Sequence, residues 1–384
     1  MIEPVPATPS GAAAAINAPE SADPKTAESL VGRVFEASIG MFEVMSVYLG
    51  DRLGLYRALH DSGPATAAEL AARAGIDERY AREWLEQQAV ADLLDVVEPA
   101  SGPTAADDRR YGLPSAYAAA LLDPDSPMSI APIARSLVAC AKVLPQLLEA
   151  YRTGGGVDWA DYGPDMIEAQ GDFNRPWLVN SFGQEILPAI PAVHDRLAAA
   201  GGPRVADVAC GVGWASIAIA RAYPNVNVDG FDLDPSSIEL ARANAERAGV
   251  ADRVTFAVRD AADPAAAGQY DVAVVIEAIH DLSRPIEVLG AIRGMLRHDG
   301  VALIADERTE DAFTAPGSEV ERIYYGFSLF TCLPAAMTER PTAGTGTVMR
   351  ADTLRDYADA SGFGGFERLD EPALDLLRFY LLTP

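Results

Sequence analysis

The chain has 384 residues, of which 56 are acidic and 30 basic, and its formal net charge is −26 at neutral pH. Long-range repulsion disfavours binding to nucleic acid or to an anionic membrane, so a neutral or cationic small molecule is the expected partner. No apolar run reaches the roughly 20 residues that span a bilayer, and the three cysteines and four histidines show no disulfide or zinc-ligand spacing. These features predict a globular, cytoplasmic protein that holds no metal.

The first part of the chain predicts a tail followed by helices. Residues 1–25 are rich in Ala and Pro and lack the basic start and apolar block of a signal peptide, which favours a disordered tail. Apolar residues at helical spacing predict two consecutive helices over residues 26–60. Thr66 and Glu69 form a capping-box pattern before a third helix, and Asp77 is the expected N-cap of a fourth.

A short pair of strands is expected next. The sequences LLDVV and RRYGLP flank a polar loop and predict a two-stranded wing, so residues 26–120 have a winged-helix pattern. In a winged helix that reads DNA, the last helix needs basic side chains to meet phosphates. Acidic residues outnumber basic ones on that helix here, with Asp77, Glu78, Glu83 and Glu86 against Arg79 and Arg82. A ligand-sensing transcription regulator is therefore the less favoured alternative.

The rest of the chain divides into a connector and an α/β domain. Residues 121–200 keep helical spacing between Pro and Gly breaks, which indicates a helical connector and substrate cover. Over residues 201–384 strand-like apolar runs alternate with helical runs, which is typical of a parallel sheet with crossover helices. We expect one helix over 286–300, the next strand over 301–307, and two final strands at FERLD and LLRFYLLT.

Polar or turn residues follow each of the first five predicted strands of this sheet. Ligands of parallel sheets bind at the carboxyl ends of the strands, so these residues are the candidates for a site. In chain order they are the turn Ala209-Cys210-Gly211-Val212-Gly213, Asp232, Asp260, the stretch from Glu277 to Asp281, and Asp306-Glu307.

The glycine turn after the first strand predicts a nucleotide cradle. A strand, a glycine turn and a helix N-terminus together present unpaired N–H groups to an anionic or nucleotide ligand. Asp232 lies 19 residues beyond Gly213, near the spacing that brings a carboxylate to ribose hydroxyls. Alone it could equally form a strand-end turn. Ser216 occupies the place of a dinucleotide fold's third glycine, and Asp207 precedes the turn inside the strand.

An acid before the turn, in the spacing Asp207-x-Ala209-x-Gly211-x-Gly213, is typical of class I S-adenosylmethionine-dependent methyltransferases. Residues 203–384 resemble that family. The resemblance implies a Rossmann-like seven-stranded core that binds S-adenosylmethionine and releases S-adenosylhomocysteine. Asp207 would orient the loop or meet the methionine amino group, and the two glycines would lie under the ligand. Ala209 replaces the family's usual first glycine. Because alanine tolerates positive φ poorly, we expect an α- or β-like backbone there.

The same resemblance assigns roles to the later strand ends. Asp232 would hold the ribose and Asp260 the adenine amino group, while Leu233 and Ala261 would pack on the adenine ring. The remaining candidates for contact with the cofactor are Glu277 and Phe173.

The N-terminal module narrows the resemblance. A winged-helix-like module, the sequence FNRPW in the connector and His280-Asp281 after the fourth strand are similar to small-molecule O-methyltransferases of natural-product metabolism. In those enzymes the module forms a homodimer and covers the substrate. The similarity implies that His280 deprotonates an acceptor hydroxyl, oriented by Asp306 or alternatively by Asp281. A phenol of pKa about 10 needs such a base near neutral pH. A histidine that only packs or contacts the cofactor is the alternative.

Aromatic side chains are the candidate substrate contacts, because their faces suit a flat acceptor. They are Trp177 in the connector and Tyr324, Tyr325, Phe327 and Phe330 after the fifth strand, and part of them could instead be core between the domains. The sequence thus predicts an S-adenosylmethionine-dependent methyltransferase of a small, aromatic or natural-product hydroxyl. Methylation of nitrogen or carbon, or another cofactor-dependent reaction on the same fold, is the alternative.

Overall fold

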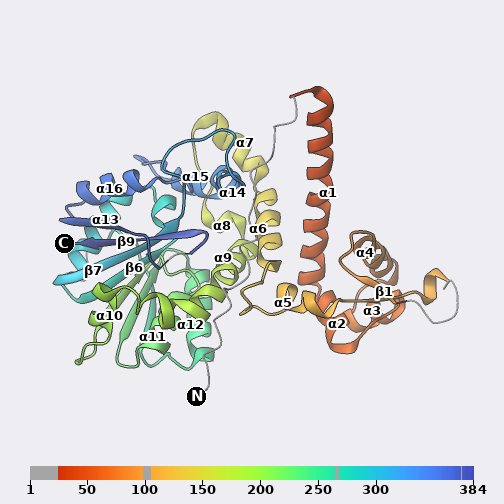
Figure 1. Ribbon diagram of the computed structural model, residues 1–384, viewed down its shortest axis with the longest axis horizontal. Coiled ribbons are helices and arrows are strands. Elements are labelled where there is room, and N and C mark those ends of the chain that lie inside the picture. The colour runs from red at the N-terminus through yellow and green to blue at the C-terminus, as the bar shows by residue number, and fades with distance from the viewer. Residues whose placement is uncertain (1–24, 98–104, 264–267, 373) are drawn as a thin grey trace, which may run out of the picture. The chain divides into compact units, whose positions relative to one another are not determined.

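The computed structural model describes residues 25–97, 105–263, 268–372 and 374–384 (Figure 1). The chain separates into two units, residues 1–42 and 43–384. The predicted disordered tail lies outside the described residues except for Lys25.

The N-terminal module contains the predicted helices and wing. Its elements are α1 (Ala27–Arg52), α2 (Leu55–Ser62), α3 (Ala67–Ala74), α4 (Glu78–Val90), the strands β1 (Asp95–Val97) and β2 (Arg110–Gly112), and the turn η1 (Ala106–Asp108). The capping box is confirmed, since Thr66 Oγ1 accepts from the Glu69 N–H at 3.3 Å and Glu69 Oε2 accepts from the Thr66 N–H at 3.1 Å. Asp77 caps α4, and β1 pairs antiparallel with β2 as the wing.

The connector is helical, as expected. Its elements are η2 (Ser115–Tyr117), α5 (Ala118–Leu121), α6 (Ala131–Lys142), α7 (Leu144–Thr153), α8 (Trp159–Tyr162), α9 (Pro164–Trp177), the π-helical η3 (Leu178–Ile186) and α10 (Pro191–Leu197). Pro176 lies inside α9 and has no N–H to donate, which accounts for the change of helical register that follows it.

Among the described residues, no single helix has the length and apolar composition to cross a membrane. In the described part of the chain, α6 and α7 taken together are the only helix pair that meets that requirement, and the chain bends by 57° between them.

Seven strands form one mixed sheet, which confirms the predicted fold class. They are β3 (Arg204–Val208), β4 (Asn227–Asp232), β5 (Val254–Val258), β6 (Tyr270–Ile276), β7 (Leu296–Glu307), β8 (Gly365–Leu369) and β9 (Leu377–Thr383). The order across the sheet is β5-β4-β3-β6-β7-β9-β8. Strands β3 to β7 run parallel, and β9 is antiparallel to both β7 and β8.

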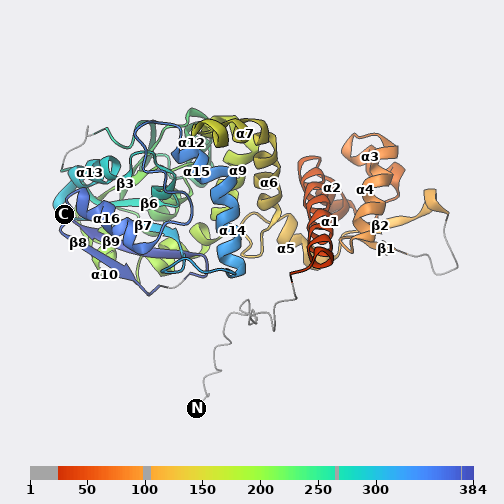
Figure 2. The same ribbon diagram turned by 90° about the horizontal axis from the view of Figure 1, so that it is seen from above.

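Helices cover both faces of the sheet (Figures 1 and 2). The remaining elements are α11 (Trp214–Ala222), α12 (Pro235–Ala248), η4 (Ile279–Asp281), α13 (Pro285–Met295), α14 (Glu319–Phe327), η5 (Ser328–Cys332), α15 (Leu333–Ala336) and α16 (Ala351–Ala360). One buried apolar cluster joins the sheet to α10, α11 and α12, and a second joins it to α13 and α16. These clusters fix the strand ends that carry the candidate site.

One predicted boundary is wrong. The helix expected over 286–300 ends at Met295, and β7 begins at Leu296 rather than at residue 301. Leu296 has an extended backbone and pairs with Tyr270 ahead of a β-bulge. An apolar residue between a helix and a strand fits the spacing of either element, so pairing with a distant strand decides its conformation.

The turn at Gly213 gives a stability prediction. Gly213 has a φ of +84°, and an added Cβ would lie 2.6 Å from the Phe256 ring and 3.1 Å from Ala241 Cβ. Gly213→Ala combines left-handed strain with overpacking, so we expect urea unfolding to show a loss of about 2–4 kcal/mol. Gly249 also has a left-handed φ of +71°, but an added Cβ there meets nothing within 4 Å. Gly249→Ala is the control, with an expected loss of about 1 kcal/mol; equal losses would contradict the packing argument.

Candidate active site

The turn between β3 and α11 is held in a left-handed conformation. The φ angles are +56° at Ala209, +50° at Gly211 and +84° at Gly213. The expectation of an α- or β-like backbone at Ala209 is therefore wrong. The Cys210 N–H donates to the Phe231 carbonyl at 2.9 Å, which ties the turn to β4 immediately after Ala209. We take that bond to offset the roughly 1–2 kcal/mol that a left-handed alanine costs.

Asp207 lies under the turn and fastens it to α11. Its side chain is 2% exposed and accepts from the Ser216 N–H at 3.1 Å and the Ser216 hydroxyl at 2.5 Å. Burial raises the pKa of Asp207 to about 6, although both hydrogen bonds act in the opposite direction. This arrangement gives Ser216 a structural role where a dinucleotide fold has glycine.

Asp232 ends β4 beside the same turn. One carboxylate oxygen accepts from the Gly211 N–H at 2.8 Å and the other from the Asp234 N–H at 2.9 Å. A carboxylate offers about four acceptor positions, so capacity for two further donors is left. Leu233, next in the chain, is 61% exposed, and an added Cβ at Gly211 would meet nothing within 4 Å. An open glycine turn beside a carboxylate with spare acceptor capacity fits the ribose and methionine parts of S-adenosylmethionine.

Asp260, after β5, is already partnered. It accepts from the Ala262 N–H at 2.8 Å and lies 3.2 Å from an Arg284 Nη atom, while Ala261 is buried. An adenine amino group would therefore share this carboxylate with Arg284. The sequence did not predict Arg284 as a partner of Asp260, because it lies 24 residues further along the chain and outside the strand-end residues.

Glu277 follows β6 with a φ of +49°. The side-chain amides of Gln170 and Asn174 from α9 donate to the same carboxylate oxygen, Gln170 at 2.9 Å. Trp177 Nε1 in turn donates to Asn174 Oδ1 at 2.9 Å. Burial raises the pKa of Glu277, and the hydrogen bond from Asn174 opposes that rise. Phe173, on the same helix, is half-buried.

His280 lies in η4 and contacts acids at both ring nitrogens. Nδ1 is 2.8 Å from Asp306 Oδ1 and 3.0 Å from Glu307 Oε2, and Nε2 is 3.1 Å from Asp281 Oδ1. His280 and Asp306 are each 1% exposed. Burial alone would lower the pKa of His280, but the three carboxylates outweigh it and raise that pKa well above the usual 6.5. Glu307, missed as a contact of His280, has a pKa well above its usual value, chiefly through burial.

Three carboxylate oxygens around His280 make no well-aligned hydrogen bond among the described residues, although two of them lie 3.0 and 3.1 Å from its ring nitrogens. They are Asp281 Oδ1, Asp306 Oδ2 and Glu307 Oε2, all buried. Ligand-type atoms lie within 4.8 Å of one another in two sets, His280-Asp306-Glu307 and His280-Asp281-Cys332, so either set could hold a metal ion. The cluster has spare capacity for donors or a cation.

The predicted aromatic contacts fall into two groups. Trp177 packs against the core cluster, edge-on to Phe182 with ring centroids 5.4 Å apart. Tyr324 is buried, and its hydroxyl donates to the Leu376 carbonyl at 2.5 Å. The others are more open on α14 and η5: Phe327 is half-buried, and Tyr325 and Phe330 are exposed.

Two family models match the chain. Residues 200–343 match a methyltransferase domain, and residues 41–122 match a winged helix-turn-helix domain described as Rv2258c-like. Among curated relatives, the ribosomal protein L11 methyltransferase of Dechloromonas aromatica is 46% identical over 85 residues, 22% of this chain and 25% of that protein. The O-methyltransferase rstn1 of Aspergillus nomiae is 32% identical over 115 residues, 30% of this chain and 51% of that protein. The chain thus spans a quarter to a half of the length of these relatives.

Solved structures match over nearly the whole chain. Human N-acetylserotonin methyltransferase, in complex with S-adenosylmethionine, is 16% identical with a TM-score of 0.66, covering 94% of this chain and 99% of that one. Mitomycin 7-O-methyltransferase is 19% identical with a TM-score of 0.66, covering 93% and 98%. A riboflavin-analogue N,N-dimethyltransferase of Streptomyces davawensis is 20% identical with a TM-score of 0.58, covering 94% and 100%. These identities show a shared fold. The chain therefore carries a methyltransferase domain over residues 200–343 behind a winged-helix domain over residues 41–122, on a fold that these methyltransferases share.

Proposed function

We propose that this chain transfers a methyl group from S-adenosylmethionine to a hydroxyl of a small, aromatic or natural-product molecule. One observation carries the proposal: the glycine turn with Asp232 and the buried His280–Asp306 pair lie at the carboxyl ends of neighbouring strands in one sheet. Cofactor and base can thus serve one reaction site. The solved relatives named for O-methylation support the choice of a hydroxyl.

The cofactor supplies a methyl group on a sulfonium, which is an electrophile that needs no metal. In the proposed complex Asp232 accepts from the ribose hydroxyls, and Gly211 and Gly213 let the ligand lie against the backbone. Asp207 keeps the turn in shape through Ser216, because its carboxylate is buried and already bonded. Asp260 shares its carboxylate between Arg284 and the adenine amino group, with Leu233 and Ala261 at the ring.

His280 is the proposed general base. Asp306 holds Nδ1, so Nε2 is the nitrogen that would take the proton of the acceptor hydroxyl. The methyl group would pass from sulfur to oxygen as the sulfur–methyl bond breaks, and S-adenosylhomocysteine would leave. Asp281 contacts Nε2 in this structure, so the acceptor hydroxyl must enter between these two groups. The three carboxylates around the ring can then stabilise the imidazolium that results.

Two alternatives have less support. Methylation of nitrogen has two supporting observations. The acids around His280 suit an amine, and the chain is similar in fold to an N,N-dimethyltransferase.

DNA binding is disfavoured, because Arg79 and Arg82 on α4 form ion pairs with acidic side chains. Phosphates would have to displace those partners.

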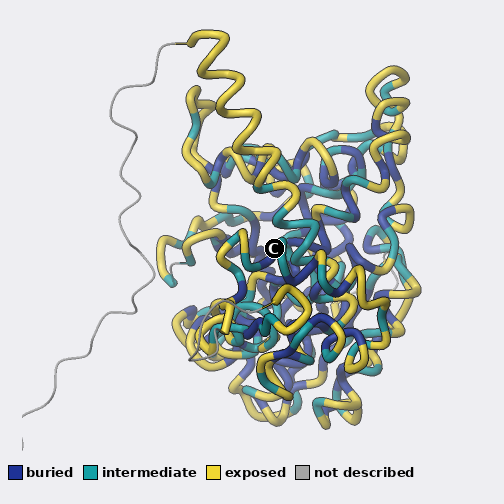
Figure 3. Tube along the Cα trace, turned by 90° about the vertical axis from the view of Figure 1, so that its right-hand side faces the viewer, coloured by how far each residue is buried: buried dark blue, intermediate teal, exposed yellow. Residues whose placement is uncertain are grey.

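A homodimer is part of the proposal. The first half of α1, residues 27–42, is exposed along most of its length (Figure 3). Its exposed apolar side chains are Leu30, Val31, Val34, Phe35, Ile39, Met41 and Phe42. A contiguous apolar face of this kind marks an interaction surface, and the same face of a second copy is a matching partner.

The three cysteines are free, which suits the reducing cytoplasm in which we place the enzyme.

Cofactor binding is the first test. Calorimetry should show S-adenosylhomocysteine binding to the wild-type chain, and Asp232→Ala should weaken it at least 10-fold because two charge-assisted hydrogen bonds are lost. Asp229→Asn is the control, since Asp229 lies on the same strand but bonds Arg204, Thr255 and Tyr270 instead. Absence of binding to folded wild-type protein would refute the cofactor assignment.

Turnover tests the base. His280→Gln should lower kcat roughly 10²- to 10⁴-fold while the Kd for S-adenosylhomocysteine stays within a few-fold of wild type. The base must be neutral, and the acids raise the pKa of His280, so wild-type kcat should rise with pH above 6.5. Asp306→Asn removes one of those charges and should move this rise to lower pH.

The controls for turnover address metal use and the base assignment. Treatment with EDTA should leave wild-type kcat unchanged, because no step requires a metal. Near-wild-type kcat in His280→Gln, or an unmoved pH profile in Asp306→Asn, would show that His280 is not the base.

The dimer is tested by light scattering. The double variant Val34→Glu, Phe35→Glu places two charges on the apolar face of α1 and should convert a wild-type dimer into a monomer. Tyr80→Glu, at an exposed position on α4, is the control and should remain dimeric. A monomeric wild-type protein, or a dimeric double variant, would contradict this surface as the interface.

A further inference from the structure

Helix α9 has two faces with different partners. Asp165, Glu168 and Asp172 recur at spacings of three and four residues and share one face. Gln170 and Asn174 are four residues apart on the opposite side of the helix. The first face meets residues 48–52 of α1 and the helix α6, and the second meets the candidate active site.

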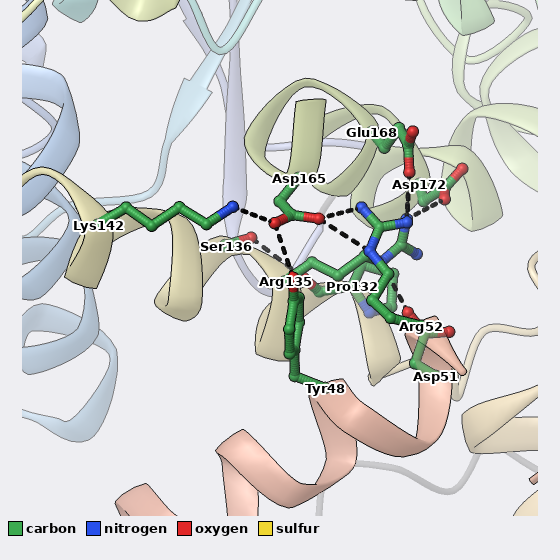
Figure 4. Close-up of polar contacts among 10 residues, drawn as sticks. All are labelled: Tyr48, Asp51, Arg52, Pro132, Arg135, Ser136, Lys142, Asp165, Glu168 and Asp172. Carbon is green, nitrogen blue, oxygen red and sulfur yellow. Dashed lines mark hydrogen bonds and ion pairs between the residues drawn. The ribbon is translucent and has the colours of Figure 1, made fainter. Parts of the chain in front are cut away.

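The acidic face of α9 is held by a network of cations (Figure 4). Arg52 Nε donates to Asp165 Oδ1 at 2.8 Å, and Arg52 Nη1 donates to Glu168 at 2.6 Å. Tyr48 donates to Asp165 at 2.9 Å, and Lys142 also pairs with Asp165. Burial would raise the pKa of Asp165, but these donors lower it to about 2. The carboxylate is therefore ionised and committed to this network at neutral pH.

Arg135 of α6 completes the network from a buried position. Its side chain is 9% exposed and lies 2.9 Å from Asp172 and 3.2 Å from Asp51, with Glu168 at 3.6 Å. These acids compensate the cost of burying the cation, and the ion pairs connect α6 to α9 and to the end of α1.

The side of α9 that carries Gln170 and Asn174, with Gly171 at its edge, touches both parts of the proposed cofactor site. Gln170 and Asn174 donate to Glu277 at the end of β6. Gly171 packs so closely on the glycine turn that an added Cβ would lie 2.1 Å from Val212 Cγ2. A small displacement of α9 would therefore alter the hydrogen bonds of the Glu277 carboxylate and the packing of the glycine turn.

Ion pairs, more than apolar packing, hold α9 to the winged-helix module. The apolar core of that module forms a cluster separate from the cores of the connector and the sheet. A cavity of about 210 Å³ lies beside the network, and Asp51, Arg135 and Asp172 are among its lining residues. The link between α9 and the winged-helix module thus depends on charges, while Met166 and Ile167 pack α9 against the cores of the connector and the sheet.

We propose that Arg52 and Arg135 are positioning residues for cofactor binding. They hold α9 where Asn174 and Gly171 meet Glu277 and the glycine turn, so the winged-helix module sets the affinity for the cofactor. The proposal rests on the cofactor site of the proposed function. Any event that disturbs residues 48–52, such as association of the winged-helix module with a partner, would then change the affinity for the cofactor.

The test is calorimetry with S-adenosylhomocysteine on the full chain. Arg52→Met and Arg135→Met should each raise the Kd roughly 3- to 30-fold, although neither residue touches the cofactor site. Arg79→Met is the matched control, because Arg79 pairs with Glu83 on the exposed surface of the same module, and its Kd should equal that of wild type. Arg52→Lys keeps the charge but loses the fork of donors, so it should give a smaller increase.

A double variant distinguishes coupling from general destabilisation. Asn174→Ala alone should raise the Kd, and adding Arg52→Met to it should raise the Kd by less than the product of the single effects, because both act through α9. Wild-type Kd in folded Arg52→Met and Arg135→Met, or effects that multiply in the double variant, would overturn the proposal. Absence of binding to the wild-type chain would overturn the proposed function instead. Should Arg135→Met fail to fold, Arg52→Lys and the double variant decide.

Discussion

Strand β3 pairs in parallel with β4 on one side and with β6 on the other, so the order of strands reverses at β3. In sheets of this kind the loops that leave the two neighbouring strands diverge and leave a crevice at the carboxyl ends. The glycine turn after β3, Asp232 after β4 and Glu277 after β6 all border that place. The geometry of the candidate site follows from this pairing together with the hydrogen bond between Cys210 and Phe231.

A second constraint is the concentration of carboxylates around one imidazole. Asp281, Asp306 and Glu307 all contact His280, and the ring is almost completely buried. Removing several charges from water costs more than their mutual contacts return, unless protons or donors compensate. Burial raises the pKa of Glu307, which reflects this cost, whereas the carboxylates raise the pKa of His280, so that a proton on the ring offsets their charge. Such departures gather where proton transfer is needed, which is why the cluster supports a base more than a structural histidine.

Periodicity and turn chemistry in the sequence predicted most of the fold. The capping box at Thr66, the cap at Asp77, the wing and the strands of the sheet all depend on residues close together in the chain. The rule that ligands bind at the carboxyl ends of parallel strands likewise assigns the glycine turn, Asp232 and His280 to one candidate site. The contact of Nδ1 with Asp306 agrees with the partner expected for His280, while its role as a base stays a prediction.

What the sequence could not predict depends on distant partners. The left-handed Ala209 is set by a hydrogen bond to β4, and the early start of β7 is set by pairing with Tyr270. Gln170 and Asn174 read as ordinary polar residues of a helix, because their acceptor Glu277 lies more than 100 residues away in the chain. The ion pairs on the other face of α9 could not be predicted for the same reason, since Arg52 and Asp165 lie 113 residues apart in the chain.

The central claim is that the turn after β3 and the carboxylate after β4 form the cofactor site. A crystal structure of the chain with S-adenosylhomocysteine tests it most directly. The account predicts both ribose hydroxyls within hydrogen-bond distance of Asp232, with the homocysteine part over Gly211 and Gly213. Density for the ligand at another place, or ribose hydroxyls that point away from Asp232, would contradict it.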